Sequence, residues 1–328
     1  MRLVRKNSFR KTVGKAEAEQ VSELRSYNAF RIVGIGASAG GLEAFTLLLS
    51  SLPKNTGMAF VLVQHLDPTH HSHLRDLLAK ATTMPVREVK NGMPIVPDTI
   101  SVIPPNVDMG IERGKLRLTP RAERQIPHLS VDFLFRSLAK EQQSLAIGVI
   151  LSGTGSDGAG GVGEIKGVGG LTFAQVETSA KCSGTPLHAG NVDFVLSPQK
   201  IAAELARIGH DPYLMLPEKT ESDELQLNVA KDFRRILAIL RSHTNLDLSH
   251  YRDTTIKRRI HRRMVVAARP ALKDYIKLLE KDSAEVKALF EDVLINVTSF
   301  FRDPEMFEVL KAKVFPQILK NTPPIIRV

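Results

Sequence analysis

The chain has 328 residues, 43% of them hydrophobic, which is enough to bury a core in about two domains. Its formal net charge of +10 allows it to bind acidic partners. No apolar run approaches the roughly 18 residues of a membrane span, and the basic N-terminus lacks the apolar core of a secretory signal. The single cysteine excludes an internal disulfide and fits the cytoplasm. Aromatic residues make up only 5% and tryptophan is absent, which argues against base stacking, so we expect neither a nucleic-acid partner nor membrane insertion.

Residues 1–28 are polar and basic and are predicted to form a tail. Residues 29–210 alternate short β-branched strands with helical patterns, which predicts an α/β domain with a doubly wound, mostly parallel sheet. Gly114 marks a hairpin that is inserted into this pattern. The last helix of the domain follows Ser197, with proline at its first position, and ends near Gly209.

A glycine-rich motif, Gly34–Gly41, follows the apolar run 31–33 and precedes a helical pattern at 42–49. It places Ser38 where a strand turns into a helix, among glycines that allow a substrate to approach closely. The unpaired N–H groups of the helix N-terminus are aimed at the same point, which makes Ser38 a candidate nucleophile. By itself the motif fits two other interpretations equally well: a dinucleotide-binding loop, and a glycine turn needed only for packing.

Two further residues favour the nucleophile. His65 lies at the C-terminal end of the apolar strand 59–63. Asp157 follows the apolar strand 146–151 in a glycine-rich loop, which also offers N–H groups for an oxyanion hole. Because the carboxyl ends of parallel strands share one edge of a sheet, both residues can converge with Ser38. A hydroxyl needs a base to become a nucleophile, and the base needs a carboxylate to hold its tautomer.

Three motifs recur in order: Gly-Ala-Ser-Ala-Gly-Gly at 36–41, Val-Gln-His-Leu at 63–66 and Leu-Ser-Gly-Thr-Gly-Ser-Asp-Gly at 151–158. Together they resemble the catalytic domain of the chemotaxis receptor methylesterase, CheB, over residues 30–210. The resemblance implies that Ser38 is the nucleophile, His65 the base and Asp157 the carboxylate that orients it. It also implies oxyanion positions on the backbone at Thr154 and Ala39.

Departures from this family pattern leave a non-catalytic receptor-binding module as the alternative function. Ala39 follows the nucleophile, where regulated stand-alone esterases usually carry threonine. The stretch 182–190 looks shorter than the loop that lies beside the family's site, and it has Thr185 where methionine is usual.

A cluster of three histidines, His70, His71 and His73, resembles a set of metal ligands. Its position at the start of a helix favours polar capping instead. We therefore expect no metal, and the acyl-transfer chemistry implied above needs no cofactor.

A linker is predicted at 211–227, and from residue 228 the pattern changes to that of a small all-α domain. Ile256, Ile260 and Met264 recur at i, i+4 and i+8 and so define one apolar helix face. The rest of that helix is strongly basic, with Lys257, Arg258, Arg259, His261, Arg262 and Arg263. The four arginines are candidate contacts to acidic receptor helices, and a solvated helix face is the other interpretation.

Two motifs, Thr254–Met264 and Ile295–Asp303, resemble the helical N-terminal domain of the chemotaxis receptor methyltransferase, CheR, which would span 228–322. In that family the second motif contributes to the methyl-donor pocket, with its arginine at Arg302. Residues 323–328 look like the first strand of the methyl-donor domain, cut before its glycine-rich loop. The expectation is a truncated CheB/CheR fusion with no functional cofactor site at Arg302 and no methyl transfer.

These resemblances imply a cytoplasmic protein-glutamate methylesterase, which hydrolyses glutamate γ-methyl esters on the cytoplasmic helices of methyl-accepting chemotaxis receptors. They imply glutamine deamidation as a second activity, because an amide passes through the same tetrahedral species. Residues 1–28 leave no room for the receiver domain that usually precedes a CheB-like esterase. The identity of the receptor and the oligomeric state stay open at this point.

Overall fold

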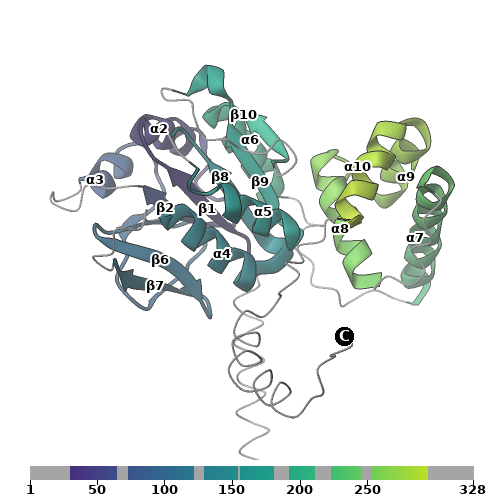
Figure 1. Cartoon of the computed structure of the whole chain (residues 1–328), viewed down its shortest axis with the longest axis horizontal. Coiled ribbons are helices and arrows are strands. Elements are labelled where there is room, and N and C mark those ends of the chain that lie inside the picture. Colours follow the sequence, from purple (N-terminus) through teal and green to yellow (C-terminus); the bar gives the residue numbers. More distant parts are fainter. Residues whose placement is uncertain are drawn as a thin grey trace, which may run out of the picture. The chain divides into compact units, whose positions relative to one another are not determined.

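A computed structural model of the chain describes residues 30–64, 73–121, 129–153, 156–180, 192–210, 223–244 and 253–294, with the side chains of 223–230 left out. Within these ranges the chain forms an α/β domain, and a group of helices follows it in the sequence (Figure 1). This arrangement confirms the predicted fold class. No helix among the described residues has both the length and the apolar character needed to cross a membrane.

Seven described strands form the main sheet, in the order β10-β9-β8-β1-β2-β5-β3, and every neighbouring pair is parallel. The strands are β1 (Ile32–Ala37), β2 (Ala59–Gln64), β3 (Val86–Glu88), β5 (Ile100–Val102), β8 (Ala146–Ile150), β9 (Leu171–Gln175) and β10 (Phe194–Leu196). From β1 the chain first builds the β2 side of the sheet and later returns to the β8 side. The carboxyl end of β1 is therefore the switch point at which open α/β sheets bind their ligands.

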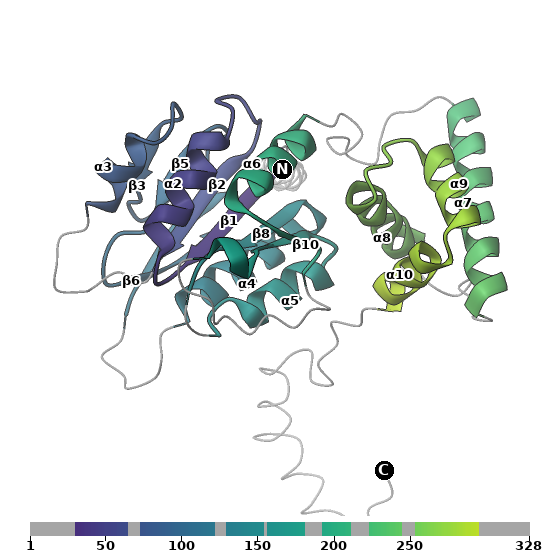
Figure 2. The same ribbon diagram turned by 90° about the horizontal axis from the view of Figure 1, so that it is seen from above.

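Helices cover both faces of this sheet (Figure 2). One face packs on α2 (Gly41–Ser51), α3 (Leu74–Ala79) and α6 (Pro198–Gly209), and the other on α4 (Ser130–Gln142) and α5 (Ala159–Gly167). Side chains of β1 alternate between the two cores, because Val33 and Ile35 lie in the first and Ile32 in the second. The α6 helix starts directly after Ser197 and ends at Gly209, as predicted.

The glycines at the start of the Gly34–Gly41 motif belong to a strand, not to a turn. Strand β1 runs on to Ala37, and its glycines lie on the face that packs against α4. A Cβ atom on Gly36 would come within 2.3 Å of Val131 Cγ1, and one on Gly34 within 2.9 Å of Leu138 Cδ2. These glycines therefore let α4 approach the sheet closely, and the turn itself is made by Gly40, whose φ is 77°.

A small antiparallel sheet joins β6 (Val107–Glu112) and β7 (Lys115–Pro120) with β4 (Met93–Pro94). Its two-residue turn consists of Arg113 and Gly114, with φ values of 49° and 70°. Positive φ at both positions is typical of the tight turn that matches the twist of a hairpin. The hairpin predicted around Gly114 is thus confirmed.

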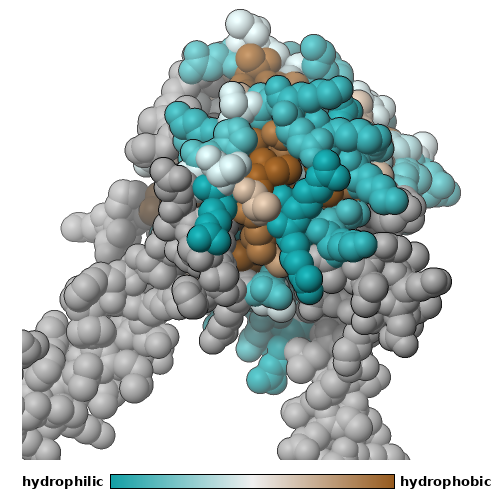
Figure 3. All heavy atoms as spheres, turned by 90° about the vertical axis from the view of Figure 1, so that its right-hand side faces the viewer, coloured by the Kyte–Doolittle hydropathy of each residue, from teal (hydrophilic) through white to brown (hydrophobic). Residues whose placement is uncertain are grey.

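The helices of the second region are α7 (Asp223–Thr244), α8 (Asp253–Val266), α9 (Leu272–Lys281) and α10 (Ser283–Leu294). The predicted apolar face of α8 is confirmed, because Ile256, Ile260 and Met264 all lie in the core of this region. Single-turn 3-10 helices at Gln143–Leu145 and Glu177–Ser179 complete the described elements. Figure 3 shows that hydrophilic residues surround a narrow strip of hydrophobic residues on one face of the molecule.

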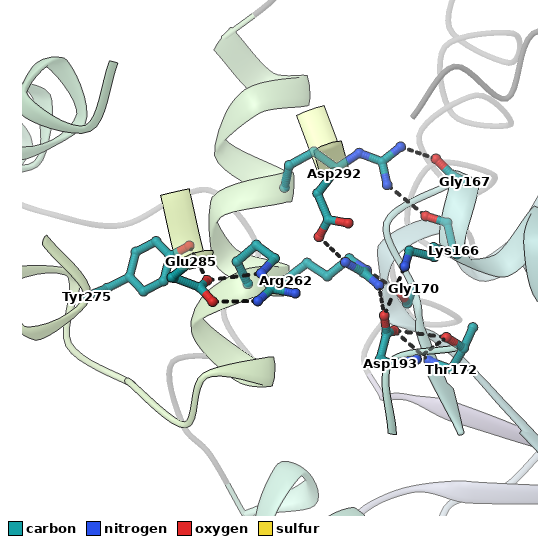
Figure 4. A network of polar contacts seen from close by, with 11 residues as sticks. Lys166, Gly167, Gly170, Thr172, Asp193, Arg262, Tyr275, Glu285 and Asp292 are labelled. Atoms are coloured by element: carbon teal, nitrogen blue, oxygen red, sulfur yellow. Dashed lines mark hydrogen bonds and ion pairs between the residues drawn. The ribbon is translucent and has the colours of Figure 1, made fainter. Parts of the chain in front are cut away.

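Two basic residues of α8, Arg259 and Arg262, do not lie on a solvated face, whereas Lys257 and His261 are exposed. Arg259 and Arg262 are each only 3% exposed, because their guanidinium groups contact residues of the α/β domain. Figure 4 shows these contacts for Arg262. Arg263 forms an ion pair with Glu285, and the side chain of Arg258 lies against Gly169. Arg259 and Arg262 are therefore buried in this structure, and receptor contact by the four arginines stays a prediction.

Candidate active site

Ser38 is the first residue after β1 and immediately precedes the turn into α2. Its backbone N–H donates a hydrogen bond of 3.0 Å to the carbonyl oxygen of Ser152, and its own carbonyl accepts one of 2.9 Å from the N–H of Gly41. The residue is half-buried, and it lies at the N-terminus of an eleven-residue helix. Ser38 therefore lies close to the positive end of the α2 dipole.

Asp157 lies in the loop that follows β8, the strand next to β1. Its Oδ2 accepts the N–H of Val131 at 3.0 Å, and its Oδ1 accepts the N–H of Asp132 at 2.9 Å. Both donors belong to the first turn of α4, whose N–H groups have no partner within the helix. The carboxylate therefore caps α4, a role that the sequence analysis missed because the two segments are far apart in the chain.

The register of the sheet brings two of the three predicted triad positions, Ser38 and Asp157, to one edge. Gly36 of β1 pairs with Ile150 of β8, and Ala37 of β1 pairs with Gln64, the last residue of β2. Ser38 and Asp157 thus follow neighbouring strands at the same carboxyl edge. His65 comes next after Gln64 in the sequence but lies outside the described residues, so its contact with Ser38 stays a prediction.

Several other predicted positions also fall outside the described ranges, namely Thr154, Thr185, Arg302, His70 and His71. Ala39 is described and exposed, and its carbonyl oxygen accepts a hydrogen bond from the Ser152 hydroxyl. His73 is at the N-cap of α3 but makes no side-chain capping bond there. Among the described residues, no three His, Cys, Asp or Glu side chains are grouped closely enough to hold a metal ion.

Ser152 is a residue of the site that sequence reasoning did not single out. It is buried, and its Oγ donates to the carbonyl oxygen of Ala39 at 2.9 Å while its own carbonyl accepts the Ser38 N–H. Its N–H donates to Oε1 of Gln175 at 2.9 Å, and Nε2 of Gln175 donates to the carbonyl oxygen of Ser179 at 2.7 Å. Ser152 thereby ties the nucleophile turn to β9. The only sequence signal was its place in the motif at 151–158.

Among the described residues, the side chains whose pKa is shifted by burial lie in the helical region. They form a structural network and not an acid–base pair. Glu285 accepts a hydrogen bond from the Tyr275 hydroxyl at 2.8 Å and one from Nε of Arg263 at 3.0 Å. Burial raises the pKa of Tyr275, and the charge of Glu285 raises it further. Burial alone would lower the pKa of Arg263, but the hydrogen bond and charge of Glu285 raise it overall. The phenol stays neutral and the guanidinium stays charged.

A parallel sheet with a serine before a helix N-terminus and an aspartate after the neighbouring strand is an arrangement that hydrolases with a nucleophilic serine also have. Comparison with protein families makes this class specific. The chain belongs to the CheB methylesterase family, whose model matches residues 33–205. The all-alpha domain of the CheR methyltransferase matches residues 231–294, so the predicted resemblance to a CheB/CheR fusion is confirmed.

Individual relatives agree with this assignment. The chain is 35% identical over 267 residues to an uncharacterised 104.1 kDa protein of Rhodobacter capsulatus, which covers 75% of this chain and 28% of that protein. It is 36% identical over 182 residues, 54% of each chain, to protein-glutamate methylesterase/protein-glutamine glutaminase 3 of Pseudomonas aeruginosa. The chain therefore spans about half of the length of this second relative and less of the first.

A solved structure gives the same result for the fold. The crystal structure of the CheB methylesterase catalytic domain of Thermotoga maritima has a TM-score of 0.50 and 29% sequence identity to this chain. The match covers 55% of this chain and 98% of that domain. The α/β domain described above is therefore similar to a CheB catalytic domain over nearly the whole length of that domain.

Proposed function

We propose that the chain hydrolyses γ-methyl esters of glutamate side chains on the cytoplasmic helices of chemoreceptors. The observation that carries the proposal is the arrival of Ser38 and Asp157 at one sheet edge, from neighbouring strands within the region matched by the CheB methylesterase family. The name of the Pseudomonas aeruginosa relative, which includes both a glutamate methylesterase and a glutamine glutaminase, supports deamidation as a second activity.

The proposed mechanism is acyl transfer through a covalent intermediate. The Ser38 hydroxyl oxygen attacks the ester carbonyl while His65 takes its proton, and Asp157 orients His65. Backbone N–H groups at Thr154 and Ala39 stabilise the oxyanion. His65 returns the proton to the departing methanol, and water then attacks the acyl-enzyme, with His65 again as base, to release glutamate and free Ser38. This sequence of steps uses side chains and backbone of the chain alone.

Methanol release from a methylated receptor fragment tests the proposal. We expect Ser38→Ala and His65→Ala each to lower the rate by orders of magnitude, and the double variant to be little worse, because a triad acts as a unit. Ser51→Ala is a matched control, because Ser51 is exposed at the end of α2 and its hydroxyl donates to the carbonyl oxygen of Leu47.

Two outcomes would contradict the proposal. Wild-type methanol release by Ser38→Ala would show that another group is the nucleophile. Receptor binding by the wild-type chain without any methanol release would instead favour the non-catalytic receptor-binding module. Deamidation is measured in parallel as ammonia release from the same fragment with glutamine at the modified positions.

A further inference from the structure

The α/β domain presents a surface that suits arginine side chains. It consists of the C-terminal end of α5, the turn at 168–170 and Asp193, which precedes β10. The last carbonyl oxygens of a helix lack intrahelical partners and carry the negative end of its dipole, so they attract cations. We call this set of groups the α5 surface.

Arg259 of α8 occupies the helix end of the α5 surface. Its Nη1 donates to the carbonyl oxygen of Lys166 at 2.7 Å, and its Nη2 donates to that of Gly167. Burial and the neighbouring charges of Arg258 and Arg262 lower the pKa of Arg259 to about 10. Burial of this cation is thus unfavourable by itself, and the two carbonyl oxygens offset part of that cost.

The glycine turn lets α8 come this close. Gly169 has a φ of 89°, and a Cβ atom there would be 3.1 Å from Cγ of Arg258. A side chain at this position would therefore be strained and would press on the helix. The carbonyl oxygen of the next residue, Gly170, accepts a hydrogen bond of 3.0 Å from Nε of Arg262.

Arg262 is the centre of a buried network of charges (Figure 4). Its guanidinium group forms ion pairs with Asp193 of the α/β domain and with Asp292 of α10. The three side chains are 1%, 2% and 4% exposed, respectively. A buried charge that loses its partner is strongly destabilising, so Arg262 needs both carboxylates.

Asp193 is held in place independently of α8. Its Oδ2 accepts the N–H of Thr172 at 3.0 Å and the hydroxyl of Thr172 at 2.9 Å. The Nζ atom of Lys166 lies 3.4 Å from Oδ1 of Asp193. The α5 surface therefore offers a fixed carboxylate, which lowers the entropic cost of receiving a guanidinium group.

Apolar contacts extend the same interface. Val265 of α8 is buried in the hydrophobic core on the α2 and α6 side of the sheet, and Val266 packs against that core. Arg207 of α6 donates to the carbonyl oxygen of Val265 at 3.0 Å. The end of α8 is thus embedded in the α/β domain through its backbone, its apolar side chains and its arginines.

We propose that the α5 surface is a docking site for α8, and that docking withholds Arg259 and Arg262 from acidic partners. An acidic helix would have to compete with Asp193 and the α5 carbonyl oxygens for the same guanidinium groups. Access of such a partner to α8 then requires the helical region to leave the α/β domain. This inference goes beyond the proposed esterase activity and does not depend on it.

Arginine footprinting of the full chain tests the docking directly. The chain is labelled with phenylglyoxal, which modifies accessible guanidinium groups, and each arginine is followed by mass spectrometry. We expect Arg259 to react at least about tenfold more slowly than the exposed Arg269, because a buried group reacts only when its surroundings open. Arg259 is the best reporter, because its Nη1 and Nη2 both donate to carbonyl oxygens of the α/β domain.

A pair of variants separates docking from the fold of the helical region. Asp193→Asn removes the charge that receives Arg262, and we expect it to raise the labelling rate of Arg259 several-fold. Asp274→Asn is the matched control, because Asp274 is exposed and pairs with Lys277 within α9. If Asp193→Asn does not fold, Arg262→Gln leaves Asp193 in place and is expected to release Arg259 in the same way.

Binding of poly-L-glutamate, measured by fluorescence anisotropy, tests the masking. We expect Asp193→Asn to bind this polyanion about tenfold more tightly than the wild-type chain at low salt, with the difference fading at high salt. Adding Arg259→Gln and Arg262→Gln should reverse the gain. Rapid labelling of Arg259 in the wild-type chain, or unchanged labelling and binding in Asp193→Asn, would overturn the proposal. The inactive Ser38→Ala variant should give the wild-type footprint, so a failure of the esterase proposal remains distinguishable.

Discussion

Asp157 has one observed task and one proposed task in this chain, and substitution separates them. Its two carboxylate oxygens accept hydrogen bonds from the N–H groups of Val131 and Asp132 at 3.0 and 2.9 Å, which is the observed task. The proposed task is to orient His65. A carboxylate that only orients a histidine can be removed with little loss of stability. A carboxylate that also caps α4 cannot, because Ala leaves two helix N–H groups without an acceptor.

The size of the loss follows from the geometry. Hydrogen bonds to a charged group contribute about 1.5–3 kcal/mol each, whereas a typical N-cap substitution costs about 0.5–2 kcal/mol. Asp157 is half-buried, so water can replace part of what is lost. We therefore expect Asp157→Ala to lower the free energy of unfolding by about 2–3 kcal/mol, between these two limits. Asp157→Asn keeps one acceptor oxygen and should lose about half as much.

Chemical denaturation of the full chain, followed by circular dichroism, measures this loss. Asp76→Ala is a suitable control, because Asp76 lies in the first turn of α3 but forms an exposed pair with Arg75. Such a surface pair contributes about 0–1 kcal/mol. If Asp157→Ala abolished methanol release while its unfolding curve matched that of the wild type, the capping argument would be refuted. The activity of Asp157→Asn must accordingly be corrected for its folded fraction.

Three further substitutions test the packing that positions the site and the contacts of the helical core. Gly36→Ala should lower the free energy of unfolding by about 1–3 kcal/mol in denaturant titrations, because its Cβ would lie 2.3 Å from Val131 Cγ1. An unchanged free energy of unfolding would mean that α4 can shift freely. Tyr275→Phe should lower the free energy of unfolding by about 1–2 kcal/mol in the same assay, because Glu285 loses a 2.8 Å hydrogen bond. Glu285→Ala should lower it more, because the half-buried Arg263 then lacks its carboxylate partner; equal losses would contradict this order.

Much of the fold was predictable because it depends on local patterns. The strands at 59–64 and 146–150 are short apolar runs between turn signals, and the apolar face of α8 follows helical spacing. The turn at Gly114 follows from a two-residue hairpin geometry that glycine favours. These patterns also placed Ser38 and Asp157 at one edge, since parallel strands align their carboxyl ends.

The remaining features depend on contacts between distant segments, which no local pattern reports. Gly34 and Gly36 look like a turn in the sequence. In the structure they leave room for α4, which begins about a hundred residues later in the chain. Arg259 looks like a solvated basic residue, but its partners are the carbonyl oxygens of Lys166 and Gly167. Spacing shows which side of a helix is charged and not what that side contacts.

Ser152 and Gln175 illustrate how such contacts can govern a reaction without touching a substrate. Ser152 bonds to Ser38 through its carbonyl oxygen and to Ala39 through its hydroxyl, so it fixes the backbone on both sides of the proposed nucleophile. Its own N–H is directed to Oε1 of Gln175 at 2.9 Å. Loss of that acceptor leaves a buried N–H without its partner, and small displacements of a nucleophile reduce turnover sharply.

On the proposed esterase activity, Gln175→Met should therefore lower kcat for methanol release by about tenfold and leave KM unchanged, because substrate contacts persist while the nucleophile is misplaced. Gln175→Glu keeps an oxygen acceptor for Ser152 and should retain most of kcat, although it loses the 2.7 Å bond to Ser179. If Gln175 had a purely structural role, both variants would be less stable, but the folded fraction of each would keep the wild-type kcat. Full turnover by Gln175→Met, measured on the folded fraction, would show that the link from β9 through Ser152 does not position Ser38.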